Sequence, residues 1–402
     1  MTDNKTKVLI LHAGFSTDIS VTDMLRLACS RNGLDLIDVS IDAEDLQNND
    51  FELEIIDKLD GEIDKLLCVV SLNVAALYLF RTPGECIHDN LNVPLVLFLI
   101  DHPSVFLELI PANLSNTLVL LIDDSFERFW HKHYSGMTLS YVCNVMPYSK
   151  YEIPAPPSFE VYRKRSGKIL APMQLSIHNY DALGWWHNID QLKEPLRGIT
   201  KEAVTAMIGD ATLEFDVFVD GEIEKHGVEL ESEDRITISQ YVDCFARLWR
   251  RQVVISSLLE FPIVVSSGTI PDTIDSKYHD KFIDTSGDET MKLFAEHQMI
   301  LNVSPAISSI IHDRVINCIN TASTLISESN RSIVQFLEPG RDFVDIPFEP
   351  EKIREKVGNI LEDPRKAYDI AVSGYETWHN NDEIHKPWRE IFEMVRMMSR
   401  NM

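Results

Sequence analysis

Short apolar segments alternate with segments of helical period along residues 7–145, and this alternation limits the possible fold more than any other feature. The apolar segments, among them Lys7–Leu11, Lys65–Ser71 and Val93–Ile100, are hydrophobic at most positions rather than at every second one. Strands buried on both faces have this composition, and they occur in parallel sheets that helices cover. The sequence therefore predicts an α/β fold with a parallel sheet.

A second series of the same kind begins at Gly167–Ala171 and continues through Pro262–Ser266. Between the two series lies the proline-rich stretch Tyr151–Ser158, which is typical of a linker. A chain of 402 residues is also too long for one ordinary core. We therefore predict two domains, residues 1–157 and residues 158–382. The less regular elements expected in the second are a helix over 191–207, a strand over 214–219 and a long helix over 236–260.

The composition excludes several kinds of partner. The formal charge of −26 repels nucleic-acid phosphates and anionic membranes, so we expect neither as a partner. No apolar run approaches the 18 or more residues of a membrane span, and the polar N-terminus does not resemble a signal peptide. The cysteines form no CxxC pair, which favours reduced, buried thiols. We expect a cytoplasmic protein without a transmembrane segment, and the sequence leaves its oligomeric state open.

Residues 301–331 form the most informative stretch. A short strand, Met299–Val303, is broken by Ser304 and Pro305, and apolar residues then recur at helical spacing from Ile307 to Ile319. A second strand, Thr324–Ser327, follows. Strand, polar turn and helix in this order commonly hold an anionic ligand, because free N–H groups at a helix start attract phosphate.

The order of motifs in the second half resembles a known family. The segments that carry the resemblance are Asp284–Gly287, Met299–Pro305, His312–Asn317, Thr324–Asn330, Phe336–Asp342 and the tail His379 to Arg389. They look like the C-terminal domain of GT-B glycosyltransferases of the broad group 1 type, and they are most similar to the CgeB-like branch.

This resemblance implies two Rossmann-like domains facing across a cleft, with a C-terminal helix, residues 383–402, packing back on the N-terminal domain. A nucleotide sugar would bind the second domain and an unknown acceptor the first. Such enzymes usually need no metal, and we expect no cofactor here. The residues agree with this, because the sequence has no His, Cys and carboxylate group at ligand spacing. We interpret Asp123 and Asp124 as an ordinary pair at a strand end.

The resemblance also suggests donor contacts. Arg314 would pair with the donor diphosphate, His312 would line the site, and Asn317 would contact the ribose where relatives often carry Glu. The other candidates are Gln174, Ser304, Ser327, Glu328, Ser329 and Asn330. Purely structural roles stay open for them: an Arg314–Asp313 pair, a helix cap at Ser304 and a polar turn at 327–330.

Catalytic candidates lie in the first domain, at the predicted carboxyl ends of strands. Asp101 and His102 end the central strand and have the chemistry of a general base for an acceptor hydroxyl, if the reaction inverts. Alternatively Asp101 caps the next turn. In the first loop His12 is a further catalytic candidate, and Gly14 would allow close approach of the acceptor to the backbone.

The sequence thus predicts a metal-independent glycosyltransferase that uses a nucleoside diphosphate sugar. One alternative is a catalytically inactive GT-B-like binding or assembly protein. The neutral Asn317 and the few Lys and Arg residues near the expected phosphate site favour it. A less favoured alternative is a sugar-nucleotide epimerase, which shares the fold.

Overall fold

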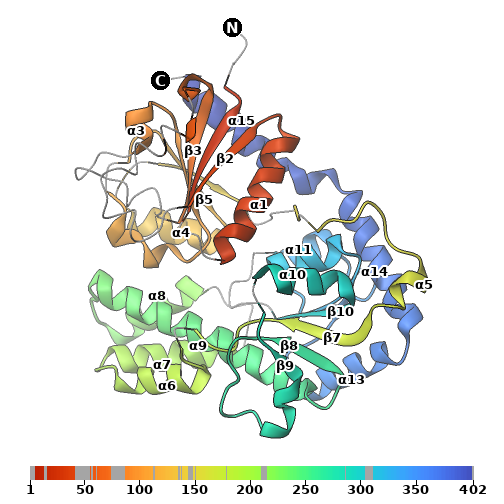
Figure 1. The fold of residues 1–402 in the computed structure, drawn as a ribbon. Coiled ribbons are helices and arrows are strands. Elements are labelled where there is room, and N and C mark those ends of the chain that lie inside the picture. The colour runs from red at the N-terminus through yellow and green to blue at the C-terminus, as the bar shows by residue number, and fades with distance from the viewer. Residues whose placement is uncertain are drawn as a thin grey trace. The chain divides into compact units, whose positions relative to one another are not determined.

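The computed structural model describes residues 5–400 except 13–15, 41–54, 56–57, 60, 74–86, 112–113, 135, 137, 144–147, 150, 178, 210–214, 286 and 304–310. The chain divides into two compact units (Figure 1). The first unit comprises Met1–Lys150 together with Asp382–Met402, and the second comprises Tyr151–Asn381.

A six-stranded parallel sheet forms the centre of the first unit, with the strand order β2-β1-β3-β4-β5-β6. Its strands are β1 (Lys7–His12), β2 (Asp35–Ser40), β3 (Leu66–Leu72), β4 (Leu95–Leu99), β5 (Thr117–Leu121) and β6 (Leu139–Val142). Every residue of β3, β4 and β5 is buried, as the continuous apolar runs predict. The order reverses between β1 and β3, which creates a topological switch point there.

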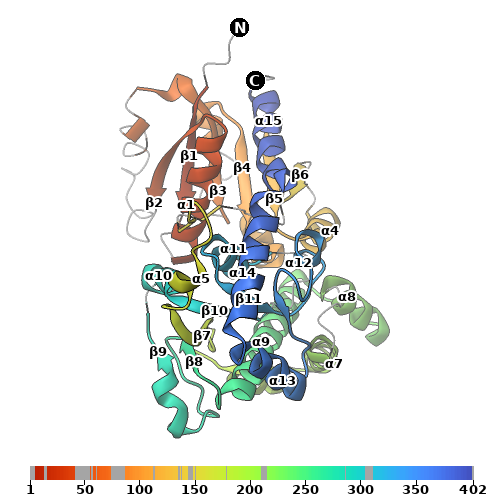
Figure 2. The same cartoon turned by 90° about the vertical axis from the view of Figure 1, so that its right-hand side faces the viewer.

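Helices accompany this sheet. They include α1 (Ser16–Arg31), α3 (Ile87–Leu91), α4 (Asp124–His133) and the C-terminal α15 (Lys386–Arg400). Helix α15 packs on the sheet of the first unit (Figure 2), where the Trp388 ring lies edge-on to Phe98 with centroids 6.1 Å apart. The Tyr141 hydroxyl also donates to Glu390 at 2.7 Å. The predicted return of the C-terminal helix to the N-terminal domain is confirmed.

The second unit has its own six-stranded parallel sheet, with the order β12-β11-β10-β7-β8-β9. Its strands are β7 (Ser166–Pro172), β8 (Ile263–Ser266), β9 (Phe282–Ile283), β10 (His297–Asn302), β11 (Thr324–Ser327) and β12 (Val344–Asp345). In chain order this is the Rossmann arrangement 3-2-1-4-5-6. The switch point lies between β7 and β10, which pair at Met299 and Ile169.

One face of this second sheet packs on helices α13 (Pro350–Leu361), α14 (Pro364–His379) and part of a long helix, α9 (Ser232–Leu258). Alternate strand residues supply this core, for example Ile169 with Ala171 and Met299 with Leu301. Helices α10 (Gly287–Glu296) and α11 (Asp313–Asn320) also pack against β10, and a short helix, α12 (Ile333–Phe336), follows β11.

The crossover from β7 to β8 contains a helical insertion made of α6 (Ala182–Gln191), α7 (Leu196–Gly209), α8 (Phe215–His226) and α9 (Figure 1). It has a separate apolar core. Helix α9 belongs to both cores, with Val242 in the insertion and Val254 under the sheet. The strand predicted over 214–219 is therefore wrong: α8 occupies this region and buries Val219 and Ile223, which lie one helical turn apart.

The helix predicted from Ile307 to Ile319 begins later than expected. Residues 304–310 lie outside the described residues, and Ile311 and His312 precede the helix α11. His312 has extended backbone angles and caps the helix, because its side chain accepts a hydrogen bond from the Arg314 N–H. Helix α11 is buried from Arg314 to Asn320, so it has no solvated polar face.

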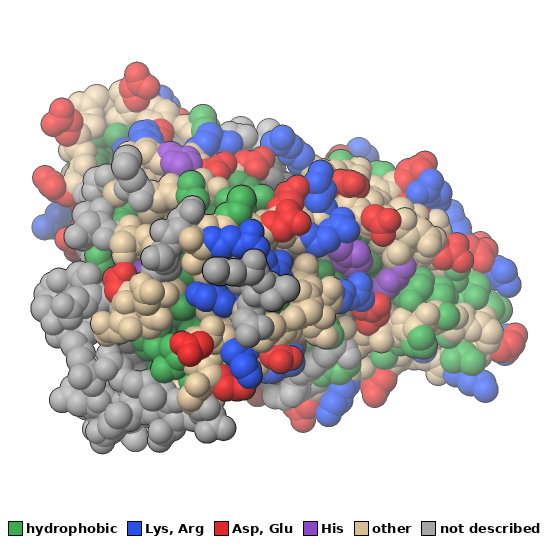
Figure 3. Space-filling view, turned by 90° about the horizontal axis from the view of Figure 1, so that it is seen from above, with side chains coloured by type: hydrophobic (Ala, Val, Ile, Leu, Met, Phe, Trp, Pro, Cys, Tyr) green, Lys and Arg blue, Asp and Glu red, His purple; other side chains and the backbone are tan. Residues whose placement is uncertain are grey.

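Two Rossmann-like α/β units, with the last helix returned to the first, are the parts of a GT-B fold, as predicted. None of the described helices is long and apolar enough to cross a membrane. The described cysteines, Cys29, Cys68, Cys143, Cys244 and Cys318, are free thiols. Acidic and basic side chains are interspersed on the face drawn in Figure 3, so no single sign of charge dominates it.

Candidate functional site

Arg314 lies at the switch point of the second sheet. Its guanidinium donates to the carbonyl oxygen of Pro172, the last residue of β7, at 3.2 Å, and to that of Val303, just after β10, at 3.4 Å. The side chain is buried in the position where these two strands separate. Arg314 therefore connects the two strand ends whose divergence forms the crevice of a Rossmann sheet.

Helix α9 brings further arginine side chains to the same place. Arg251 donates to the Gln174 carbonyl oxygen at 3.0 Å, in the loop that follows β7. Arg250 pairs with Glu328 at the end of β11, and its guanidinium lies 4.1 Å from the centre of the Phe348 ring. Arg247 pairs with Asp243 one turn away on the same helix. We call Arg247, Arg250, Arg251 and Arg314 the arginine cluster.

The cluster is electrostatically unfavourable without an anion. Burial and the neighbouring Arg314 and Arg247 guanidinium groups lower the pKa of Arg251 well below its usual value. Burial likewise lowers the pKa of Arg314 to about 10, against the attraction of Asp313. A lowered arginine pKa means that the fold destabilises the charged form, and a bound anion removes that penalty.

His312 contributes no positive charge to this region at neutral pH. Burial and the nearby Arg314 guanidinium lower its pKa to about 4, although Asp313 acts in the opposite direction. A neutral imidazole accepts a hydrogen bond on one nitrogen, which is what its capping contact with the Arg314 N–H requires. His312 thus serves as the cap of α11, and its role in lining the site stays a prediction.

The predicted site residues at the end of β11 have defined local contacts. Ser327 donates to the Glu328 carbonyl oxygen at 3.0 Å. Ser329 donates through its N–H and its hydroxyl to Asp345, at 3.0 and 2.7 Å. The Asn330 side chain accepts from the N–H of Ile333 at 2.8 Å and so caps α12. Of these residues, Glu328 is brought to the arginine cluster through its pair with Arg250.

The other predicted donor contacts differ in exposure. Gln174 is exposed, and its side-chain oxygen accepts from the Gly268 N–H at 3.2 Å, next to the end of β8. Asn317 is 1 % exposed, and its main-chain carbonyl oxygen accepts hydrogen bonds from both the N–H and the hydroxyl of Thr321. Ser304 lies outside the described residues.

In the first unit, His12 ends β1 beside the switch point and is buried. Its Nε2 lies 2.8 Å from Asp38 Oδ1, and Arg26 donates to the other oxygen of that carboxylate at 2.9 Å. The hydrogen bond from His12 is the main cause that lowers the pKa of Asp38. Sequence reasoning missed Asp38 and Arg26. Gly14 lies outside the described residues.

Asp101 and His102 follow β4 but take different partners. Asp101 is exposed and accepts from the Asn73 side chain at 3.2 Å. His102 begins the next turn, where its Nδ1 lies 2.6 Å from the Ser104 hydroxyl and its ring packs edge-on to Phe126. The expected cap of this turn is thus His102 rather than Asp101.

The pair at the end of β5 has the ordinary role that we expected. The Asp123 carboxylate accepts hydrogen bonds from the N–H of Ser125 at 2.7 Å and from its hydroxyl at 2.5 Å, and so caps α4.

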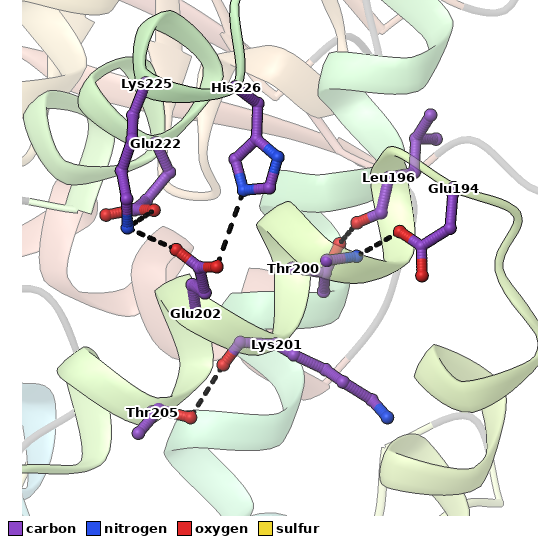
Figure 4. Close-up of polar contacts among 10 residues, drawn as sticks. Glu194, Leu196, Thr200, Lys201, Glu202, Thr205, Glu222, Lys225 and His226 are labelled. Atoms are coloured by element: carbon purple, nitrogen blue, oxygen red, sulfur yellow. Dashed lines mark hydrogen bonds and ion pairs between the residues drawn. The ribbon is translucent and has the colours of Figure 1, made fainter.

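A group with metal-ligand spacing occurs in the helical insertion. Ligand atoms of Glu202, Glu222 and His226 lie within 4.8 Å of one another among the described residues. The ammonium of Lys225 donates to both carboxylates, at 2.5 and 3.1 Å (Figure 4). These side chains therefore already form an ion-pair network between α7 and α8, away from the strand ends.

The prediction of few basic residues near the expected phosphate site is wrong, because α9 brings Arg247, Arg250 and Arg251 to the strand ends around Arg314. A signal for them was present in the sequence. Arg250 lies on the same four-residue stripe as the buried residues Ala246, Val254 and Leu258. A charged residue in the buried stripe of a helix needs a partner or a ligand.

No curated protein matches the chain. Among solved structures, HepE from Anabaena in complex with UDP and glucose matches with a TM-score of 0.46 at 10% identity, covering 97% of this chain and 99% of that one. Sucrose-phosphate synthase from Thermosynechococcus elongatus matches with a TM-score of 0.48 at 9% identity, covering 99% and 100%.

A family model described as "Glycosyl transferase-like" matches residues 251–393. The matched segment begins at Arg251 and includes Arg314 and Glu328. The match spans part of the second unit and the start of α15, less than half of the chain, and over this part the chain is similar to glycosyltransferases.

Proposed function

We propose that this protein is a metal-independent glycosyltransferase that moves a sugar from a nucleoside diphosphate sugar to an unknown acceptor. The observation that carries the proposal is the arginine cluster at the carboxyl ends of β7, β10 and β11. The match of residues 251–393 to a glycosyltransferase-like family supports it. The nearer resemblance to the CgeB-like branch stays a prediction, as does a cytoplasmic location.

The cluster supplies the charge that the reaction needs. As the acceptor oxygen bonds to the anomeric carbon, the bond from that carbon to the diphosphate oxygen breaks, and the diphosphate leaves with the electron pair. Buried guanidinium groups stabilise this developing charge without solvent reorganisation. Because they bring positive charge to the diphosphate, no metal ion is required in the proposed reaction.

Within the cluster we assign different roles to the arginines. Arg251 binds the diphosphate directly, because its bond to Gln174 uses only a carbonyl oxygen, and burial and the neighbouring guanidinium groups outweigh the attraction of Asp243 and Asp313. Arg314 is a positioning residue, since its guanidinium donates to the two strand-end carbonyl oxygens. The donor contacts assigned to Gln174, Ser304, His312, Asn317, Ser327, Ser329 and Asn330 remain predictions.

The acceptor and its base belong to the first unit in this proposal. Asp101 is the exposed candidate for the base, while His12 is buried against Asp38 and His102 is packed on aromatic rings. Asp101 would take the proton of the acceptor hydroxyl as the new glycosidic bond forms. The role of Gly14 in admitting the acceptor stays a prediction.

A nucleotide-binding protein without transferase activity is the main alternative. The burial of the neutral Asn317 favours it, because α11 then offers no carboxylate at that position to the ribose. Such a protein binds nucleoside diphosphates but hydrolyses and transfers nothing. A sugar-nucleotide epimerase would instead convert the free donor with no acceptor present.

The test is a thermal-shift screen with UDP, GDP, CMP, dTDP and inorganic pyrophosphate, followed by donor-hydrolysis assays. We expect at least one nucleoside diphosphate to raise the melting temperature at millimolar concentration. We also expect Arg251→Met to abolish that shift. If neither pyrophosphate nor any nucleotide shifts the wild-type protein, the proposed function is wrong.

Arg165 offers a matched control at the opposite end of the same sheet. Arg165 lies just before β7 and is partly buried. It donates to the Ala322 carbonyl oxygen at 3.2 Å and to the Ser323 hydroxyl at 2.9 Å. Arg165→Met removes a comparable side chain far from the carboxyl ends of the strands. It should leave the nucleotide-induced shift intact, whatever it does to stability.

A further inference from the structure

Asn302 is the last residue of β10, and it is paired in register with Ser327 of β11. Its side chain is 1 % exposed. The side-chain nitrogen donates to the Ser327 hydroxyl oxygen at 2.9 Å. An uncharged amide so completely buried is expected to use its oxygen as well as its nitrogen.

The surrounding hydrogen bonds fix which way this amide points. The Ser327 hydroxyl gives its single proton to the Glu328 carbonyl oxygen at 3.0 Å, and a carbonyl oxygen only accepts. The Asn302 atom that faces Ser327 must therefore be a donor, which is the NH₂ group. The amide oxygen Oδ1 consequently points elsewhere, and it has no hydrogen-bond donor among the residues that the structure describes.

The arginine cluster flanks this amide on both sides. Val303, next to Asn302 in the chain, carries one of the carbonyl oxygens that Arg314 binds. Glu328, next to Ser327, pairs with Arg250. In the described part of the chain the buried Nε atoms of Arg250, Arg251 and Arg314 also have no acceptor. Donors without an acceptor and the Asn302 oxygen thus occur around the ends of the same two strands, β10 and β11.

These unused groups require two kinds of partner. An ionised diphosphate carries acceptor oxygens and no donor, so it satisfies the arginines but not Asn302 Oδ1. We infer that Asn302 accepts a hydrogen bond from a hydroxyl of the donor, on the ribose or on the transferred sugar, beside the bound diphosphate. Asn302 is then a specificity-determining residue, and this inference rests on the proposed function.

The energetic consequence is a preference for ligands that carry the hydroxyl. A ligand without it leaves a buried oxygen unpaired, and this weakens binding by about fivefold or more. Asn302→Leu removes the acceptor at nearly constant size. The variant should bind pyrophosphate within about twofold of wild type and should lose its preference for the hydroxylated ligand.

The experiment measures dissociation constants by calorimetry for wild type, Asn302→Leu and Asn302→Asp. The probes are pyrophosphate, UDP and GDP, the 2′,3′-dideoxy forms of both nucleotides, UDP-glucose and GDP-mannose. We expect wild type to prefer one hydroxylated probe over its matched partner by about fivefold or more, and Asn302→Leu to reduce that ratio to near one. Asn302→Asp keeps an acceptor oxygen and should keep the preference.

The probes distinguish a hydroxyl on the ribose from one on the sugar, and they separate failure of this inference from failure of the proposed function. A preference for ribose over dideoxyribose places the hydroxyl on the ribose, and one for the sugar nucleotide over the nucleotide places it on the sugar. If wild type binds these probes but Asn302→Leu keeps every ratio, only a water satisfies Oδ1 and the inference is wrong. If wild type binds no probe, pyrophosphate included, the proposed function itself has failed.

Discussion

Arg251 and Arg314 bind main-chain carbonyl oxygens two residues apart in one segment, that of Gln174 at 3.0 Å and that of Pro172 at 3.2 Å. Two guanidinium groups are thus held close together at the switch point of a Rossmann sheet. Burial lowers the pKa of both groups, and the positive charge of Arg314 further lowers the pKa of Arg251. The arrangement is unfavourable for stability alone, so we interpret it as a binding site.

Removal of Arg251 should therefore not destabilise the ligand-free protein. A base whose pKa is lower in the folded than in the unfolded chain costs folding free energy as long as it is charged. We expect Arg251→Met to leave the free energy of unfolding unchanged or higher. Urea unfolding measures it, and a loss above about 1 kcal/mol would mean that Arg251 is structural.

Removal of Arg314 should have the opposite effect, because its two hydrogen bonds to strand-end carbonyl oxygens outweigh the cost of burying its charge. Arg314→Met leaves the carbonyl oxygens of Pro172 and Val303 without this donor at a buried position. We expect the free energy of unfolding to fall by about 2–4 kcal/mol. The same urea titration tests this, and equal stability of the two arginine variants would contradict the distinction between them.

Acid should destabilise the first unit through His88. This side chain is fully buried, its Nε2 donates to the Ser115 carbonyl oxygen at 3.0 Å, and burial lowers its pKa from 6.5. Below about pH 6.5 the His88 imidazole binds a proton in the unfolded chain but stays neutral in the folded chain, so the free energy of unfolding falls as the pH falls. In the second unit, His297 and His312 also have lowered pKa values and make that unit less stable in acid.

Replacement of His88 measures its contribution to the pH dependence of the unfolding free energy. His88→Gln should reduce the slope of unfolding free energy against pH between 6.5 and 5 by up to about 1.4 kcal/mol per pH unit. Chemical unfolding at a series of pH values measures the slope. His131→Gln, which changes an exposed imidazole of the same unit, should leave the slope as it is. An unchanged slope in His88→Gln would contradict this reading.

Two helical glycines should respond oppositely to the same substitution. A Cβ at Gly374 in α14 would lie 2.5 Å from the Asp342 carbonyl oxygen, whereas one at Gly358 in α13 would meet the Phe261 ring at 3.6 Å. The Asp342 backbone is held, because its carboxylate accepts from Ser373 at 2.6 Å and from Thr377 at 3.1 Å.

Gly374→Ala should therefore destabilise by about 1–3 kcal/mol through the clash. Gly358→Ala should stabilise by about 0.5–1 kcal/mol through helix propensity alone. Thermal unfolding of both variants checks the pair. A stable Gly374→Ala protein would show that α14 shifts away from Asp342 easily.

Much of the fold was predictable, because strands buried on both faces are visible as continuous apolar runs. The apolar runs named above at 93–100 and 324–327 lie within a few residues of β4 at Leu95–Leu99 and β11 at Thr324–Ser327. The strand predicted over 214–219 failed for a physical reason. A few alternating apolar residues fit a strand, but Val219 and Ile223 also fit a helix, and the core of the helical insertion decided between them.

The site was predictable only in part. Arg314 and Glu328 lie in the motif that carries the resemblance, so their region was found. Arg250 and Arg251 precede Arg314 by some sixty residues and lie on another helix, and only the parallel sheet brings the strand ends and α9 together. Asn302 was read as an ordinary strand residue, because the direction of an amide depends on hydrogen bonds that a sequence does not contain.

The three candidate bases of the first unit differ in ways that allow one prediction about catalysis. Asp101 is exposed and is held by Asn73 at 3.2 Å, whereas His12 is buried against Asp38. A base must reach the acceptor hydroxyl, so Asp101→Asn should lower kcat by about 10²–10⁴ while the donor KM stays within a few-fold. His12→Gln should instead lower stability more than kcat.

Asp124→Asn, at the neighbouring strand end, is the control and should keep near wild-type kcat. If Asp101→Asn transfers sugar at more than about a third of the wild-type rate, the base is not Asp101 and an inverting reaction through it is excluded.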